Sequence, residues 1–66
     1  MKFKRGEKCY WDCAANNGWL IYLGVERGWH QFALANDSSR KVWCEIPTHD
    51  LDWIKTENEA LIEGIK

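Results

Sequence analysis

The strongest constraint on this chain is one apolar run, GWLIYLGV at residues 18–25, in a sequence of only 66 residues. Branched aliphatic and aromatic side chains of this kind favour β-strands, and the run is too short to be a membrane-spanning helix. Turn-forming residues stand on both sides of it, at residues 16–18 and 26–28. We therefore predict a buried strand here, at the centre of a single small domain.

Alternation and turn signals predict three further strands, at residues 9–11, 29–34 and 40–46. The Asn-Asp-Ser-Ser sequence at residues 36–39 is typical of a turn between the last two. Period-two alternation assigns ten side chains to the buried face, namely Cys9, Trp11, Ile21, Leu23, Val25, Phe32, Leu34, Val42, Cys44 and Ile46. It assigns Tyr10, Tyr22 and Trp43 to the opposite face.

The C-terminal segment allows two interpretations. In the first, residues 47–51 form a 3₁₀ turn, residues 52–55 form a fifth strand, and a capping box at Thr56 and Glu59 starts a short helix. In the second, one amphipathic helix spans residues 48–65 and packs on a four-stranded antiparallel sheet. The sequence leaves both interpretations open.

Composition and charge indicate a soluble globular domain. Hydrophobic residues make up 45% of the chain and charged residues 29%, with five tryptophans, which is unlike a disordered segment. The formal net charge is −1, but the charges are unevenly distributed. Residues 1–41 hold seven basic and four acidic side chains, whereas residues 42–66 hold two basic and six acidic side chains. The basic start is not followed by the apolar segment of an export signal. Three cysteines, an odd number, are typical of free thiols in a reducing compartment, so we expect a cytoplasmic protein.

Short motifs between residues 6 and 54 resemble those of Tudor domains and related SH3-like barrels. The motifs are Gly6-Glu7-Lys8-Cys9, a strand led by Gly18, and Asp50-Leu51 three residues before Ile54. The resemblance implies a small β-barrel of about five strands over residues 6–55, with a helical tail over residues 56–66. Tudor domains that bind methylated lysine or arginine use an aromatic cage. Tyr22 corresponds to one wall of that cage, but the other positions hold Cys13, Ala35 and Asn36, so the resemblance implies the fold and not the ligand.

Outward aromatic side chains are the best candidates for a functional surface. Four are expected to face away from the core, and they are Tyr10, Tyr22, Trp43 and Trp53. Tyrosine and tryptophan are enriched where proteins bind one another, which predicts a protein-binding module with Trp43 as its main contact. We expect no enzyme, because His30 and His49 lie in different predicted elements and no nucleophile motif accompanies them. Domains this small and rich in tryptophan are typical of phage-type accessory or inhibitory proteins.

Two other modes of action fit parts of the sequence. The basic residues Lys2, Lys4, Arg5 and Lys8, close to Tyr10 and Trp11, would suit a nucleic-acid-binding barrel, although the acidic second half opposes it. Leu61, Ile62 and Ile65 form an apolar ridge that would suit self-association, so we expect a monomer or a weak homodimer.

A zinc site is a less favoured alternative. Three thiols and one imidazole would satisfy tetrahedral zinc, and the chain offers Cys9, Cys13, Cys44 and His49. The C-x3-C spacing is looser than that of the usual zinc knuckle, and Cys9 and Cys44 already have a place in the core. We therefore expect no metal or other cofactor, and no membrane partner.

Overall fold

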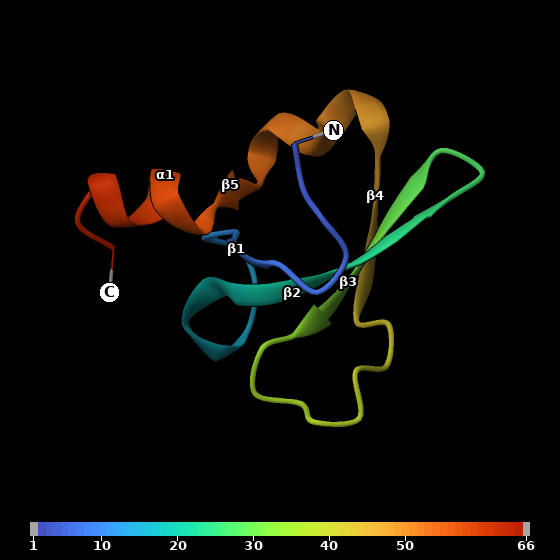
Figure 1. The fold of residues 1–66 in the computed structure, drawn as a ribbon, viewed down its shortest axis with the longest axis horizontal. Helices are drawn as coiled ribbons and strands as arrows, with labels where there is room; N and C mark the ends of the chain where they lie inside the picture. The colour runs from blue at the N-terminus through green and yellow to red at the C-terminus, as the bar shows by residue number, and fades with distance from the viewer. Residues whose placement is uncertain (1, 66) are drawn as a thin grey trace.

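One antiparallel sheet of five strands forms the centre of the structure, a computed structural model that describes residues 2–65 apart from the side chain of Asn16. The strands are β1 (Lys8–Tyr10), β2 (Trp19–Glu26), β3 (Trp29–Leu34), β4 (Cys44–Pro47) and β5 (Lys55–Thr56). Their order in the sheet is β4-β3-β2-β1-β5, which confirms that the apolar run forms the central strand (Figure 1). Within residues 2–65 no pairing joins the edge strands β4 and β5, so the sheet is open.

Two of the connections have clear local causes. A two-residue turn at Arg27 and Gly28, both with positive φ (52° and 81°), joins β2 to β3, as tight hairpins require. In the loop before β4, Asp37 accepts hydrogen bonds from the backbone N–H and the hydroxyl of Ser39, which confirms the turn predicted at residues 36–39.

The predicted phase of β2 is wrong. Leu20 and Tyr22 are buried, whereas Ile21 and Leu23 are only partly buried and Val25 is exposed. Every side chain from residue 19 to residue 23 is apolar or aromatic, so alternation carries no information about which face is inward. A bulge between Tyr22 and Gly24 then shifts the pairing with β3. The alternation of inward and outward side chains before the bulge therefore does not continue after it.

The strand β4 is shorter than predicted. It begins at Cys44 rather than at residue 40, after Arg40 adopts a positive φ of 56°. Val42 therefore lies in the loop and is 47% exposed, which corrects its assignment to the core. Trp43 still donates its N–H to the carbonyl of Phe32 and remains outward, as predicted.

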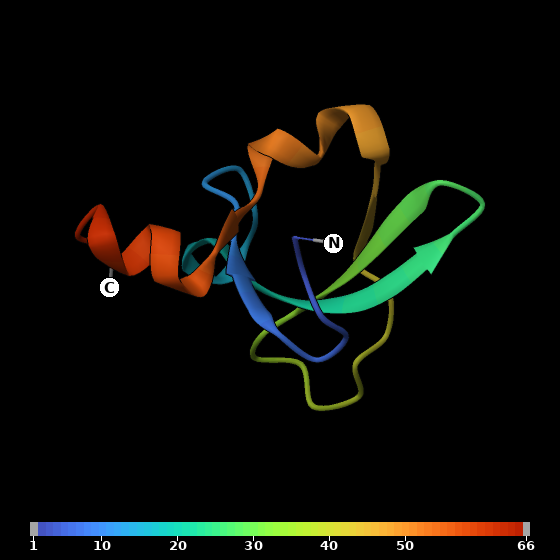
Figure 2. The ribbon, with the colours of Figure 1, turned by 45° about the horizontal axis from the view of Figure 1, so that its top comes forward.

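The core lies on the concave side of the curved sheet. Its fully or nearly fully buried members are Phe3, Cys9, Leu20, Tyr22, Phe32, Ile46 and Ile54. Phe3 was not predicted, because it stands among basic residues, yet its ring packs 5.5 Å from Tyr22 and 6.1 Å from Phe32. Figure 2 shows the N-terminal segment passing over the sheet, beneath the 3₁₀ helix η2 (Thr48–Trp53).

The C-terminal segment follows the first of its two interpretations. After η2, Ile54 is extended and buried, β5 pairs with β1, and α1 (Glu57–Ile62) begins at the capping box of Thr56 and Glu59. The 3₁₀ helix is longer than predicted and the fifth strand is shorter. The single long helix is wrong, because pairing satisfies the backbone of β1 along its second edge and requires residues 55 and 56 to be extended.

Candidate functional site

Three tryptophans from separate parts of the chain meet on one surface, and we call them the tryptophan cluster: Trp11, Trp43 and Trp53. The rings of Trp11 and Trp53 stack, with centroids 6.2 Å apart and planes 13° from parallel. Trp43 meets Trp11 edge to face at 6.5 Å. Trp43 and Trp53 are 41% and 55% exposed, whereas Trp11 is partly buried against the core. The cluster therefore presents indole surface to solvent and is anchored through Trp11.

Each of these rings projects from ordered backbone at the end of an element. Trp11 follows β1 and donates its N–H to the carbonyl of Gly18 at 2.9 Å. Trp43 precedes β4 and donates its N–H to the carbonyl of Phe32 at 2.7 Å. Trp53 is the last residue of η2. A surface built on fixed backbone loses little conformational entropy when it binds.

A hollow of about 410 Å³ opens beside the cluster. It is lined by Trp11, Asp12, Cys13 and Trp53, so two of its four lining residues are tryptophans and one is acidic. A hydrogen bond with Asp12 raises the pKa of the Cys13 thiol, which keeps the thiol protonated near neutral pH and weakens it as a nucleophile. The residue types in this hollow are therefore suited to holding a group by stacking and charge.

Two of the four predicted surface aromatics, Trp43 and Trp53, belong to the cluster. Tyr10 lies elsewhere, partly buried, with its ring 5.3 Å from that of Trp19. Sequence reasoning missed Trp11 as a member of the surface, because alternation placed it on the buried face. In the structure all three tryptophans stand at ends of elements. No such signal was present in the sequence for Trp43, because alternation placed it inside a strand predicted at residues 40–46.

Tyr22 is not a surface residue, which corrects its assignment to the binding site. It is 2% exposed, its hydroxyl lies 2.7 Å from His30 Nδ1, and burial raises its pKa. His30 Nε2 in turn lies 3.0 Å from Thr48 Oγ1, which donates to the carbonyl of Gly28 at 3.3 Å. Because the Thr48 hydroxyl has a single proton, Nε2 must be the donor to it and Nδ1 must accept from Tyr22. Both ring nitrogens of His30 are therefore used in hydrogen bonds within the fold.

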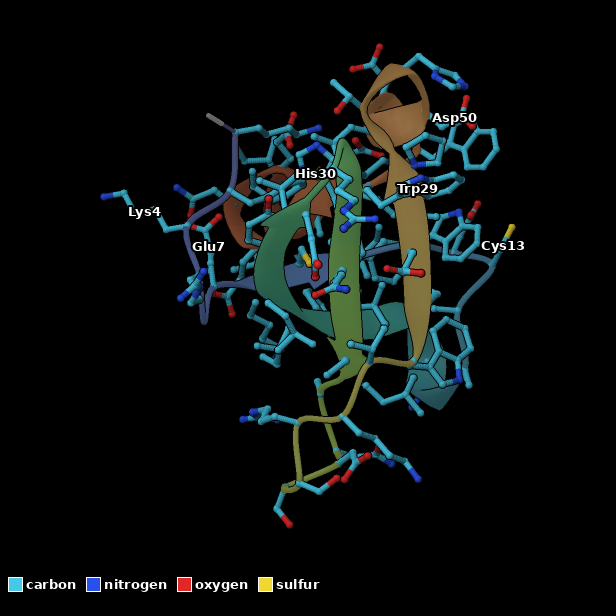
Figure 3. The ribbon with its side chains drawn as sticks, turned by 90° about the vertical axis from the view of Figure 1, so that its right-hand side faces the viewer. Lys4, Glu7, Cys13, Trp29, His30 and Asp50 are labelled. Atoms are coloured by element: carbon cyan, nitrogen blue, oxygen red, sulfur yellow. The ribbon has the colours of Figure 1, made fainter. Side chains whose placement is uncertain are left out.

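The basic residues proposed for nucleic-acid binding are distributed among structural contacts. Lys2 donates to the carbonyl of Ile54 at 2.6 Å and pairs with Glu59 at 3.5 Å. Lys8 lies 4.4 Å from the ring centroid of Trp19 and 4.0 Å from the Glu57 carboxylate. Arg5 packs its guanidinium beside Gly24, where a Cβ would lie 3.1 Å from Nη2. Lys4 is exposed, and Figure 3 shows it on the opposite side of the molecule from Cys13.

The four residues of the alternative zinc site have different environments. Cys9 is fully buried, Cys44 is partly buried, and both Cys13 and His49 are exposed. Burial raises the pKa of Cys9 to about 12 and that of Cys44 to about 11, which opposes the thiolate form that zinc requires. Across residues 2–65 no group of three or more His, Cys, Asp or Glu side chains is arranged to hold a metal ion.

A second hollow, of about 290 Å³, lies where the N-terminal segment meets α1. It is lined by Lys2, Glu7, Thr56, Glu57 and Asn58. Glu7 Oε1 is buried there and has no hydrogen-bond partner among the described residues. Acidic and basic side chains share this hollow, so it has no single charge preference.

Comparisons with protein-family models, with characterised proteins and with solved structures found no match to this chain. In the part of the chain that the structure describes, no helix is both long enough and apolar enough to cross a membrane.

Proposed function

We propose that this protein is a non-catalytic binding module that contacts a protein partner through the tryptophan cluster. The observation that carries the proposal is the contact of Trp11, Trp43 and Trp53 on one surface, with Trp43 and Trp53 substantially exposed. Large apolar rings gathered in this way favour removal from water, and tryptophan is enriched among residues that dominate protein–protein affinity. The corresponding cellular role is that of an accessory or inhibitory protein.

We further propose that the sheet is a small open barrel of the SH3 or Tudor kind. Support comes from the strand order, in which β1 lies between β2 and β5, and from η2, which connects the edge strands β4 and β5. Such a barrel would place Trp11, Trp43 and Trp53 at a rim where element ends meet. The aromatic cage of Tudor domains is not part of this proposal, because the cage wall that Tyr22 would supply is buried.

Capture of a partner by the purified protein and three alanine variants tests the proposed function. Trp53→Ala and Trp43→Ala remove exposed rings of the cluster, and Trp29→Ala removes a similarly exposed ring (47%) outside it. We expect the parent and Trp29→Ala to retain the same partner from lysate of the source cells. Trp53→Ala should weaken binding roughly 30-fold, since truncating a central interface tryptophan costs about 2 kcal/mol.

Thermal unfolding of each variant shows whether it remains folded. Equal capture by the parent, Trp43→Ala and Trp53→Ala would reject the proposal. Capture of an oligonucleotide, reversed by added salt and insensitive to Trp53→Ala, would instead support the nucleic-acid-binding alternative. A sedimentation coefficient that rises with concentration and falls on substitution of Ile62 would support the self-association alternative, because Ile62 is 85% exposed.

A further inference from the structure

We propose that the hollow beside the tryptophan cluster binds an arginine side chain of the partner protein. This inference rests on the proposed function and specifies the chemistry of the partner. The hollow is lined by two tryptophans, Trp11 and Trp53, and by one acidic residue, Asp12. An aromatic face attracts a cation through its quadrupole, and a carboxylate attracts it through its charge.

The same protein already uses this combination for one of its own cations. The Lys8 ammonium lies 4.4 Å from the ring centroid of Trp19 and 4.0 Å from Glu57 Oε2. The hollow has the same two components, indole and carboxylate, but its four lining residues include no cation. It therefore has the elements of a cation site, and none of the residues that line it supplies the cation.

The element that supplies Trp53 is acidic, which favours a cationic ligand over an acidic one. The 3₁₀ helix η2, which ends at Trp53, also carries Asp50 and Asp52. Figure 3 shows Asp50 on the same side of the molecule as Cys13. Lys55 is close enough to Asp12 for their charges to interact, but its ammonium is hydrogen-bonded to Glu63 at 2.5 Å.

Arginine fits the hollow better than lysine because of its shape. Its planar guanidinium can lie flat on an indole while two of its N–H groups donate to one carboxylate. The near-parallel rings of Trp11 and Trp53 provide flat surfaces of matching orientation beside Asp12. Lysine offers a compact, strongly hydrated ammonium that cannot stack in this way.

NMR titration with short peptides tests the inference without prior identification of the partner. The probes are acetyl-Gly-Arg-Gly-amide and two peptides in which the arginine is replaced. One carries citrulline, which is neutral and has nearly the same shape as arginine, and the other carries lysine. The indole Nε1–H signals of Trp11 and Trp53 should shift with the arginine peptide and that of Trp29 should not. We expect the citrulline peptide to bind at least about threefold more weakly, and the lysine peptide to bind between the two.

Two variants, each of which removes one negative charge, test whether the carboxylate of Asp12 contributes to peptide binding. Asp12→Asn removes the charge in the hollow, and Glu26→Gln removes a charge at the end of the β2–β3 hairpin. Asp12→Asn should weaken the arginine peptide about three- to fivefold and Glu26→Gln should leave its affinity unchanged. The assignment to arginine would be overturned if the citrulline peptide or the lysine peptide bound as tightly as the arginine peptide. It would also be overturned if Asp12→Asn bound the arginine peptide as tightly as the parent.

Failure of the arginine inference can be distinguished from failure of the proposed function. If Trp53→Ala weakens partner capture but the arginine peptide binds Asp12→Asn as tightly as the parent, the tryptophan cluster binds the partner and the arginine inference is wrong. If Trp53→Ala leaves partner capture intact, the proposed function itself is wrong, whatever the peptide titration gives.

Discussion

At the scale of single residues, the chain of hydrogen bonds from Tyr22 through His30 to Thr48 explains how two polar aromatic groups are buried in a very small core. Each polar atom in the chain has a partner, so burial costs little. Tyr22 therefore adds a large buried ring to the core, packed against Phe3 and Phe32. Sequence alternation could not detect this, since the partner of the Tyr22 hydroxyl is on another strand.

The variant Tyr22→Phe tests this hydrogen-bond chain. It removes the donor to His30 Nδ1 and leaves a buried imidazole nitrogen unsatisfied, so the free energy of unfolding should fall by about 1–2 kcal/mol. Tyr10→Phe removes a hydroxyl from a partly buried ring and should change stability by less than about 0.5 kcal/mol. Urea denaturation measures both, and equal unfolding free energies for the two variants would contradict the role assigned to Tyr22.

At the scale of elements, the sequence predicted those with strong local signals and failed where tertiary contacts decide. The bounds of β3, the turn at residues 36–39 and the capping box of α1 follow from local chemistry and are confirmed. The phase of β2 depends on a bulge, and the start of β4 depends on where pairing with β3 begins. A fifth strand was one of the two predicted outcomes, but it was placed at residues 52–55, because the position of β5 depends on its pairing with β1.

The short 3₁₀ element η1 (Asn16–Gly18) places the backbone of Trp11, and Gly18 is its key position. A Cβ at Gly18 would lie 2.5 Å from Tyr10 Cε1 and 2.9 Å from the carbonyl oxygen of Trp11. Gly28 has a similarly positive φ of 81° but open space around it. Substituting alanine at each position therefore distinguishes two costs. Both substitutions strain the backbone, and only the one at Gly18 also causes a steric clash.

We predict that Gly18→Ala destabilises the protein more than Gly28→Ala. Both variants force alanine into the left-handed region, which costs about 1–2 kcal/mol. Only Gly18→Ala must also displace Tyr10 or the Trp11 backbone, which should add about 1–3 kcal/mol. Urea denaturation of both variants gives the comparison, and an equal loss of stability would show that η1 does not hold Trp11 in place.

At the scale of the whole molecule, the basic first part and the acidic last part of the sequence meet in the fold. Lys2 and Lys8 pair with Glu59 and Glu57 of α1, so the two charged ends partly neutralise each other. The tryptophan cluster lies where β1 and η2 end and where β4 begins. Its residues are up to 42 positions apart in the sequence, and for that reason the sequence identified Trp43 and Trp53 as surface residues without showing that Trp11 joins them.

The most direct test of the central claim is the NMR spectrum of the protein in complex with its captured partner. Five indole Nε1–H signals, one from each tryptophan, report on five separate positions. We predict that the signals of Trp11, Trp43 and Trp53 change on complex formation, while that of Trp29, which is exposed but outside the cluster, does not. A complex in which the Trp29 signal changes and the three cluster signals stay at their free positions would contradict the account.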